Sequence, residues 1–184
     1  MQHTLTLQDI YLAKKRIVNI VRRTPLVQSE VLTDYVGSAV YLKLENLQET
    51  GAFKVRGALN KMLTLSKNEK RRGVITASSG NHGRGVSYAA RKLGIDSVIC
   101  LSERAPHNKV EAIRNLGSEV ILYGRTYDEA AAYTGKLLKE RGLTLIHGFD
   151  DPFVISGAGT IGLELLEDLP EIDTVIVPLS GGGA

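Results

Sequence analysis

Gly73-Val74-Ile75-Thr76-Ala77-Ser78-Ser79-Gly80-Asn81-His82-Gly83 is the stretch of sequence that decides the fold. Its first five residues form a short apolar run that is typical of a strand, and small residues follow it at 78–80. Apolar residues at helical spacing then predict a helix over 81–93, which Gly94 ends. The next apolar run, 97–101, predicts a second strand. A strand, a tight loop, a helix and another strand in this order are typical of parallel sheets.

The same alternation extends in both directions along the chain. Further helices are expected at residues 7–21, 53–66, 106–116, 127–141 and 160–169. Further strands are expected at residues 40–44, 119–123, 143–146 and 174–177. The sequence therefore predicts an α/β fold in which a mainly parallel sheet is covered by helices on both faces.

Composition narrows the class of protein. The 184 residues carry 23 Lys and Arg against 20 Asp and Glu, and the basic residues are scattered, so we expect no nucleic-acid partner. The one cysteine, Cys100, ends an apolar run and is expected to be a buried thiol, which favours a reducing compartment. No secretory signal or membrane-length apolar run is visible. We therefore expect a soluble, cytoplasmic protein.

Lys54 is the first residue that could carry chemistry. It lies in Gly51-Ala52-Phe53-Lys54-Val55-Arg56-Gly57-Ala58, just where a helix is expected to begin. The positive end of a helix dipole disfavours a charged amine by roughly 0.3–1 kcal/mol and so lowers its pKa. A nucleophilic lysine needs the neutral amine. Taken alone, however, a solvent-exposed lysine is the commoner explanation.

Two loops could bind anions. Ser78-Ser79-Gly80-Asn81-His82-Gly83 lies between a strand and a helix, where backbone N–H groups and the helix N-terminus favour a carboxylate. Ser180-Gly181-Gly182-Gly183 follows an expected strand, and consecutive glycines there can surround a phosphate with N–H groups. A capped turn and a flexible tail are the plainer alternatives for these two segments.

Other sites are less well supported. Gly157-Ala158-Gly159-Thr160-Ile161-Gly162 fits the glycine pattern of dinucleotide-binding proteins, but no acidic residue ends the next expected strand. We therefore expect Gly157 and Gly159 to permit close helix–sheet packing instead. The four histidines are dispersed without cysteines or carboxylates at ligand spacing, so no metal site is expected.

In combination, these motifs resemble the fold type II enzymes that depend on pyridoxal 5'-phosphate (PLP), in their threonine/serine dehydratase and serine racemase branch. The resemblance covers essentially the whole chain. Besides the lysine segment, the serine loop and the glycine loop, it rests on Arg23-Thr24-Pro25-Leu26, Leu42-Lys43-Leu44-Glu45-Asn46-Leu47-Gln48 and Gly159-Thr160-Ile161-Gly162-Leu163-Glu164.

The resemblance implies a role for each candidate residue. Lys54 would hold PLP as a Schiff base and later act as the general base. Asn81 would bind the phenolic oxygen of the cofactor. The phosphate would lie against Ser180, Gly181, Gly182 and Gly183, and the substrate carboxylate against Ser78, Ser79 and His82. The implied reaction is a carbon–oxygen lyase reaction that converts a β-hydroxy amino acid of the threonine or serine type into a 2-oxo acid and ammonia.

The resemblance also implies a domain organisation. Residues 1–50 would belong to a large domain, 51–150 to a small α/β domain, and 151–184 to the start of the large-domain core. The chain ends at Ala184, inside the glycine loop, which predicts a C-terminally truncated piece of a longer, homo-oligomeric protein.

Three alternatives stay open. Ser79 stands where serine racemases carry serine, so its hydroxyl could act on the opposite face of the substrate in an amino-acid racemase. Leu47-Gln48-Glu49-Thr50 and Pro178-Leu179-Ser180 resemble hydroxyectoine-utilisation dehydratases. Finally, the 184-residue chain could be an inactive fragment that only binds PLP or a partner.

Overall fold

Four parallel strands form the main sheet of the computed structural model, which describes residues 4–78 and 80–178. The strand order is β5-β4-β3-β6. These strands are β3 (Val74–Ala77), β4 (Ser97–Leu101), β5 (Glu119–Leu122) and β6 (Thr144–Leu145). The expected fold class is therefore confirmed: an α/β fold with a parallel sheet.

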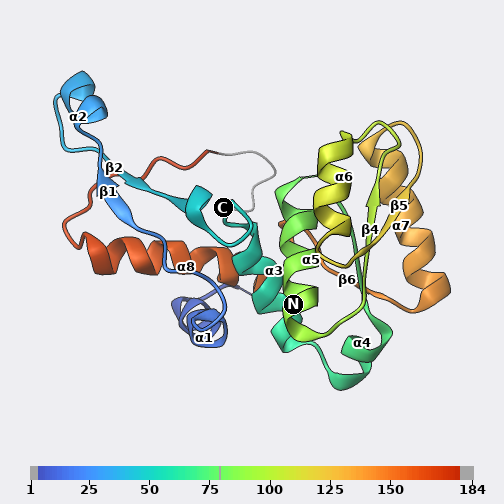
Figure 1. The fold of residues 1–184 in the computed structure, drawn as a ribbon. Coiled ribbons are helices and arrows are strands. Elements are labelled where there is room, and N and C mark those ends of the chain that lie inside the picture. The colour runs from blue at the N-terminus through green and yellow to red at the C-terminus, as the bar shows by residue number, and fades with distance from the viewer. Residues whose placement is uncertain (1–3, 79, 179–184) are drawn as a thin grey trace.

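Helices connect these strands and cover both faces of the sheet (Figure 1). They are α5 (Asn81–Leu93), α6 (His107–Arg114) and α7 (Tyr127–Arg141), whereas α4 (Lys67–Arg72) precedes β3. Side chains alternate along the strands: Ile99 packs in the cluster formed with α3, α5 and α6, whereas Ile75 and Cys100 pack against Leu137 of α7. Cys100 is buried, as expected, and burial raises the pKa of its thiol.

A second lobe lies beside the sheet lobe (Figure 1). It contains a two-stranded antiparallel ribbon, whose register pairs Leu26 with Lys43. The elements of this lobe are α1 (Leu7–Ile17), β1 (Leu26–Gln28), α2 (Glu30–Val36), β2 (Tyr41–Lys43), the 3-10 turn η1 (Glu45–Leu47) and α8 (Pro152–Asp168). Helix α2 lies at the far end of the ribbon and buries none of its residues.

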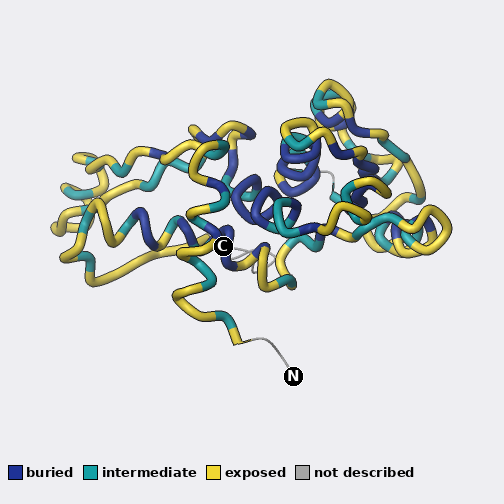
Figure 2. The backbone as a smooth tube through the Cα atoms, turned by 90° about the horizontal axis from the view of Figure 1, so that it is seen from below, coloured by how far each residue is buried: buried dark blue, intermediate teal, exposed yellow. Residues whose placement is uncertain are grey.

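Helix α3 (Lys54–Thr64) joins the two lobes because it packs against both α5 and α8. Figure 2 shows the buried residues concentrated in the helices at this junction. Gly57 and Gly157 allow the close approach of α3 and α8: a Cβ at Gly157 would lie 2.6 Å from the carbonyl oxygen of Arg56. Gly159 faces Ile10 of α1. Gly157 and Gly159 therefore permit contact between helices. The expectation that these two glycines permit helix–sheet packing is wrong.

Two other sequence expectations are also wrong. The last long helix begins at Pro152 instead of near residue 160, because Asp151 caps it and proline suits a first helical position. Residues 174–177 form no strand, and Ile176 is 92% exposed. The earlier start of α8 places the glycine pattern at 157–162 inside a helix and not between a strand and a helix, so it forms no dinucleotide-binding turn, in agreement with the sequence analysis.

Two short helices were missed. Helix α4 begins with a capping box, in which Ser66 and Glu69 bond each other's backbone N–H groups. Helix α2 lies between Ser29, its N-cap, and Gly37, which adopts a left-handed conformation. Both sets of signals are visible in the sequence, but six or seven residues are too few for a clear apolar period.

Candidate functional site

Lys54 is the first residue of α3, at the junction of the lobes. Its side chain is half-buried, and its Nζ donates a hydrogen bond of 2.9 Å to the carbonyl oxygen of Gly148. Among the described residues, the amine has no carboxylate partner. Burial lowers the pKa of the Lys54 amine, and the dipole of α3 acts in the same direction. The amine is therefore easier to deprotonate than an exposed lysine.

The serine loop follows β3 and leads into α5. The backbone N–H of Ser78 bonds the carbonyl oxygen of Cys100 at 3.2 Å, and the Ser78 hydroxyl accepts from the N–H of Gly80 at 3.2 Å. No side chain caps α5 at Gly80. A Cβ at Gly83 would lie 2.3 Å from the carbonyl oxygen of Ser78, so this compact turn requires glycine there. Such a helix N-terminus is suited to an anion.

The fold brings Lys54 and the serine loop together. Gly85, in the second turn of α5, lies against the start of α3: a Cβ there would be 3.1 Å from the backbone nitrogen of Val55 and 3.2 Å from the carbonyl carbon of Lys54. Asn81 is exposed at the first position of α5, and Ser78 is partly exposed. Ser79, Ser180, Gly181, Gly182 and Gly183 lie outside the described residues.

His82 lies beneath this loop, with 6% of its surface exposed. Its Nε2 is 3.0 Å from the carbonyl oxygen of Ile146. Because a carbonyl only accepts, Nε2 carries the hydrogen, and Nδ1 of the neutral ring is an acceptor. Nδ1 is buried and has no hydrogen-bond partner among the residues that the structure describes. Burial, reinforced by the charges of Lys54 and His147, lowers the pKa of His82 to about 4.

A buried ion cluster fixes the start of α3. Arg56 has no exposed surface, and all five of its N–H donors find acceptors. One edge of its guanidinium binds both carboxylate oxygens of Glu45, at 2.8 and 2.9 Å, and the other binds Glu164 at 2.7 and 3.0 Å. Lys43 adds a second cation, 2.7 Å from Glu164. Burial alone would lower the pKa of Arg56, but both carboxylates outweigh it and raise the pKa.

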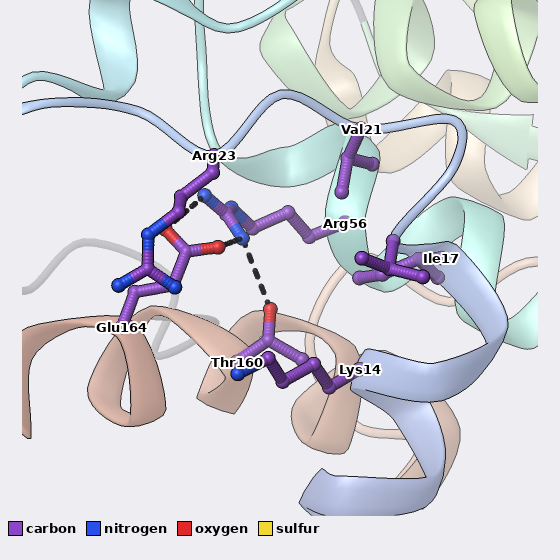
Figure 3. A pocket seen from close by; sticks show the side chains of 8 residues that line it. Lys14, Ile17, Val21, Arg23, Arg56, Thr160 and Glu164 are labelled. Atoms are coloured by element: carbon purple, nitrogen blue, oxygen red, sulfur yellow. Dashed lines mark hydrogen bonds and ion pairs between the residues drawn. The ribbon is translucent and has the colours of Figure 1, made fainter. Parts of the chain in front are cut away.

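Figure 3 shows Arg56 between Glu164 and Thr160, beside a cavity of about 50 Å³. The cavity lies between α1, α3 and α8. Its three cations are all paired: Arg56 as above, and Lys14 and Arg23 with carboxylates near the end of α8. The cavity therefore offers no free charge to a ligand.

Metal and membrane sites are absent from the part of the chain that the structure describes. In residues 4–78 and 80–178, no group of three or more His, Cys, Asp or Glu side chains could hold a metal ion. No helix in the same ranges is long and apolar enough to cross a membrane.

The chain matches the family model described as "Pyridoxal-phosphate dependent enzyme" over residues 17–184. It therefore belongs to this family of PLP-dependent enzymes, as its motifs predicted.

Named relatives narrow the branch. The L-threonine ammonia-lyase of Thermotoga maritima is 48% identical over 179 residues, which cover 97% of this chain and 45% of the relative. The L-threonine dehydratase catabolic TdcB of Staphylococcus aureus is 47% identical over 98% of this chain and 53% of the relative. The structure of maize serine racemase superposes with a TM-score of 0.95 at 39% identity, covering 98% of this chain and 55% of that one. The chain thus spans about half the length of the curated relatives it matches.

The described residues fit a PLP group. The cofactor needs a reactive lysine, and Lys54 has an amine with a lowered pKa and no carboxylate partner in the described part of the chain. It also carries anionic oxygens, and the uncapped N-terminus of α5 lies beside that amine.

Sequence reasoning missed the residues that support Lys54. The sequence analysis gave Arg56 and Lys43 no role of their own, yet the side chain of each is buried against Glu164, more than 100 residues away. One signal was available: Arg56 lies among apolar residues in the expected helix at 53–66. The carbonyl of Gly148 gave no signal because every residue has one.

We expect Arg56→Met to lower the free energy of unfolding by about 3–5 kcal/mol, because it leaves the Glu45 carboxylate without a cation and Glu164 with Lys43 alone. Arg23→Met is the matched control: Arg23 pairs with α8 from a half-exposed position and should cost only about 0–1 kcal/mol. Urea unfolding measures both. If the two variants lose the same free energy of unfolding, the buried position of Arg56 does not explain its contribution to stability.

His82 should make the fold acid-sensitive. Above pH 6.5 the His82 ring is neutral in both the folded and the unfolded chain, so it contributes fully to the stability of the fold. Between pH 6.5 and about 4 only the unfolded chain takes up the proton, so stability falls as pH falls, by about 3 kcal/mol in total. His82→Gln retains a donor near Ile146 and should lack this loss. His107→Gln, which changes an exposed histidine, should keep it. Unfolding curves across pH 4–7 measure the difference.

Proposed function

We propose that this chain forms the catalytic part of a PLP-dependent dehydratase that converts a β-hydroxy amino acid of the threonine or serine type into a 2-oxo acid and ammonia. One observation carries the proposal: a half-buried amine of lowered pKa, Lys54, lies beside a serine loop at a helix N-terminus. The identity of 48% to an L-threonine ammonia-lyase supports the choice of reaction.

Lys54 has two tasks in this proposal. Its Nζ holds the cofactor covalently before substrate arrives, and the freed amine then removes the proton from Cα of the substrate. Both tasks need a neutral amine, which burial favours. PLP, when bound, supplies the electron sink that stabilises the negative charge left at Cα.

The loops orient substrate and cofactor. We assign the substrate carboxylate to Ser78, Ser79 and the backbone at His82, since the helix N-terminus favours an anion there. The His82 ring is better suited to hold the loop from below, because it is buried and bonds Ile146. We assign the phenolic oxygen of PLP to Asn81, and its phosphate to Ser180, Gly181, Gly182 and Gly183.

The wider setting follows from the same proposal. Residues 1–50 and 151–184 belong to the large domain and 51–150 to the small domain, and α3 lies at their boundary. The whole protein is a cytoplasmic homo-oligomer. A hydroxyectoine-pathway substrate remains within this reaction class, since it too is a dehydratase reaction.

Amino-acid racemisation is the second candidate. It is favoured by the TM-score of 0.95 with maize serine racemase and by the serine at position 79. A hydroxyl there could return a proton to Cα on the face opposite Lys54.

We expect the intact protein to show a visible band with PLP, and borohydride reduction to fix the cofactor on Lys54. Lys54→Ala should lose both signals and lower the rate of 2-oxo acid formation by roughly 10²–10⁴-fold, because it removes the base. Lys67→Ala, an exposed lysine of α4, is the control and should retain both. A native protein that stays colourless with PLP would contradict the proposed function.

Deuterium oxide separates the two candidate reactions. A racemase should return inverted substrate that carries deuterium at Cα, and Ser79→Ala should abolish inversion while elimination continues. Inversion that persists unchanged in Ser79→Ala would exclude Ser79 as the second acid–base group.

A further inference from the structure

Helix α3 presents two lysines to one turn of the chain, residues 147–151. Lys54 and Lys61 are seven residues apart, about two helical turns, so they lie on the same face of α3. Lys61 forms an ion pair of 2.7 Å with Asp151, whereas Lys54 donates to the carbonyl oxygen of Gly148 at 2.9 Å. The same turn therefore gives one lysine a carboxylate and the other an uncharged acceptor.

The side chain of His147 shapes this turn. Its Nδ1 accepts from the backbone N–H of Asp150 at 2.8 Å and of Phe149 at 3.3 Å. These two donors require a lone pair on Nδ1 and hold the chain tightly around Gly148. The preceding residue is fixed as well, since Ile146 donates to Ile75 at 2.9 Å and accepts from His82 at 3.0 Å.

The far end of the turn is equally fixed. Asp151 caps α8, with its Oδ1 accepting from Phe153 at 2.8 Å and from Val154 at 3.2 Å. Its other oxygen holds Lys61. Between these two anchored ends, the position of the Gly148 carbonyl depends on the hydrogen bonds to His147.

The type of hydrogen-bond partner affects the protonation of a lysine amine. A carboxylate partner strongly favours the ammonium form of a lysine. A carbonyl accepts an N–H from either the charged or the neutral amine, so it directs the nitrogen and favours the ammonium form less strongly than a carboxylate does.

We propose that His147 is a positioning residue for Lys54: by bonding the backbone of residues 149 and 150, it holds the Gly148 carbonyl where the Lys54 amine docks. This role rests on the proposed function, in which Lys54 is the reacting amine. His147 touches no substrate and acts only through the turn.

The test compares three variants of the intact protein. His147→Ala removes the acceptor. In His147→Asn, Oδ1 occupies nearly the position of Nδ1 and can bond the backbone two residues on, so it should restore the turn. Phe149→Ala removes the edge-to-face ring contact of His147, 4.6 Å between centroids, but leaves Nδ1 in place.

The first readout needs no cofactor. Acetic anhydride labels neutral amines, and peptide mass spectrometry follows Lys54 against Lys61 as an internal standard over a range of pH. Loss of the carbonyl removes a bond that favours the charged amine, so the labelling midpoint of Lys54 should fall by about half a unit in His147→Ala, and labelling at pH 7 should rise about threefold. Burial is the cause of the lowered pKa of Lys54. The ionisable groups around this turn are His82, His147, Asp150 and the Lys61–Asp151 ion pair.

The second readout is PLP capture. His147→Ala should need at least about threefold more PLP for half occupancy of Lys54, because the amine is no longer directed. General loosening of the fold would expose Lys54 and raise its labelling midpoint, because burial is what lowers the pKa of this amine. A lower midpoint together with weaker PLP capture therefore distinguishes the positioning role from loosening. His147→Asn should return both values to those of the native protein, and Phe149→Ala should change neither.

Three results would overturn the proposal: unchanged labelling and capture in His147→Ala, no recovery in a folded His147→Asn, or the same changes in Phe149→Ala. If His147→Ala does not fold, His147→Gln serves instead, because its oxygen lies one bond too far from the backbone. If native protein fails to capture PLP, the proposed function fails, while the labelling comparison still decides whether His147 positions the amine.

Discussion

Arg56 is the residue around which the junction of the two lobes is built. Moving a guanidinium out of water costs free energy. That cost is offset only when every N–H group finds an acceptor and the positive charge is balanced. Glu45 and Glu164 balance the charge and, together with Thr160, accept every N–H; these residues come from η1 and α8. Because Arg56 lies two residues after Lys54, the same bonds that satisfy the guanidinium fix the start of α3. The placement of the candidate reactive amine thus depends on an ion cluster that does not touch it.

Three kinds of contact act together on α3. The glycines at 57 and 157 let α3 and α8 approach closely, Gly85 brings α5 against the first turn, and the turn at 147–151 holds two lysine side chains. Each contact joins segments that are far apart in sequence. These contacts hold the backbone that carries the Lys54 amine in one position, and such pre-organisation is what the proposed proton transfer requires.

Burial and ion pairing shift the pKa values at this site in opposite directions. It lowers the pKa of Lys54 and of His82, which favours the neutral forms of both, while paired carboxylates raise the pKa of Arg56. An amine that burial makes easier to deprotonate and a guanidinium that carboxylates hold in its charged form therefore coexist within one turn of helix. The difference arises from their partners, a single carbonyl in one case and two carboxylates in the other.

By itself, the sequence determined the parallel sheet, the bounds of α5 and α7, the buried thiol at Cys100 and the family, because apolar period, capping residues and short motifs are local signals. It also pointed to Lys54 and the serine loop. It misplaced the start of α8 and predicted a strand at 174–177, since a strand needs a neighbour that no local pattern reveals. Only the tertiary structure decided that Arg56 is buried, that His82 bonds Ile146, and that Gly148 receives the lysine. These are contacts between residues 64 to 108 positions apart, and they exist only once the chain has folded.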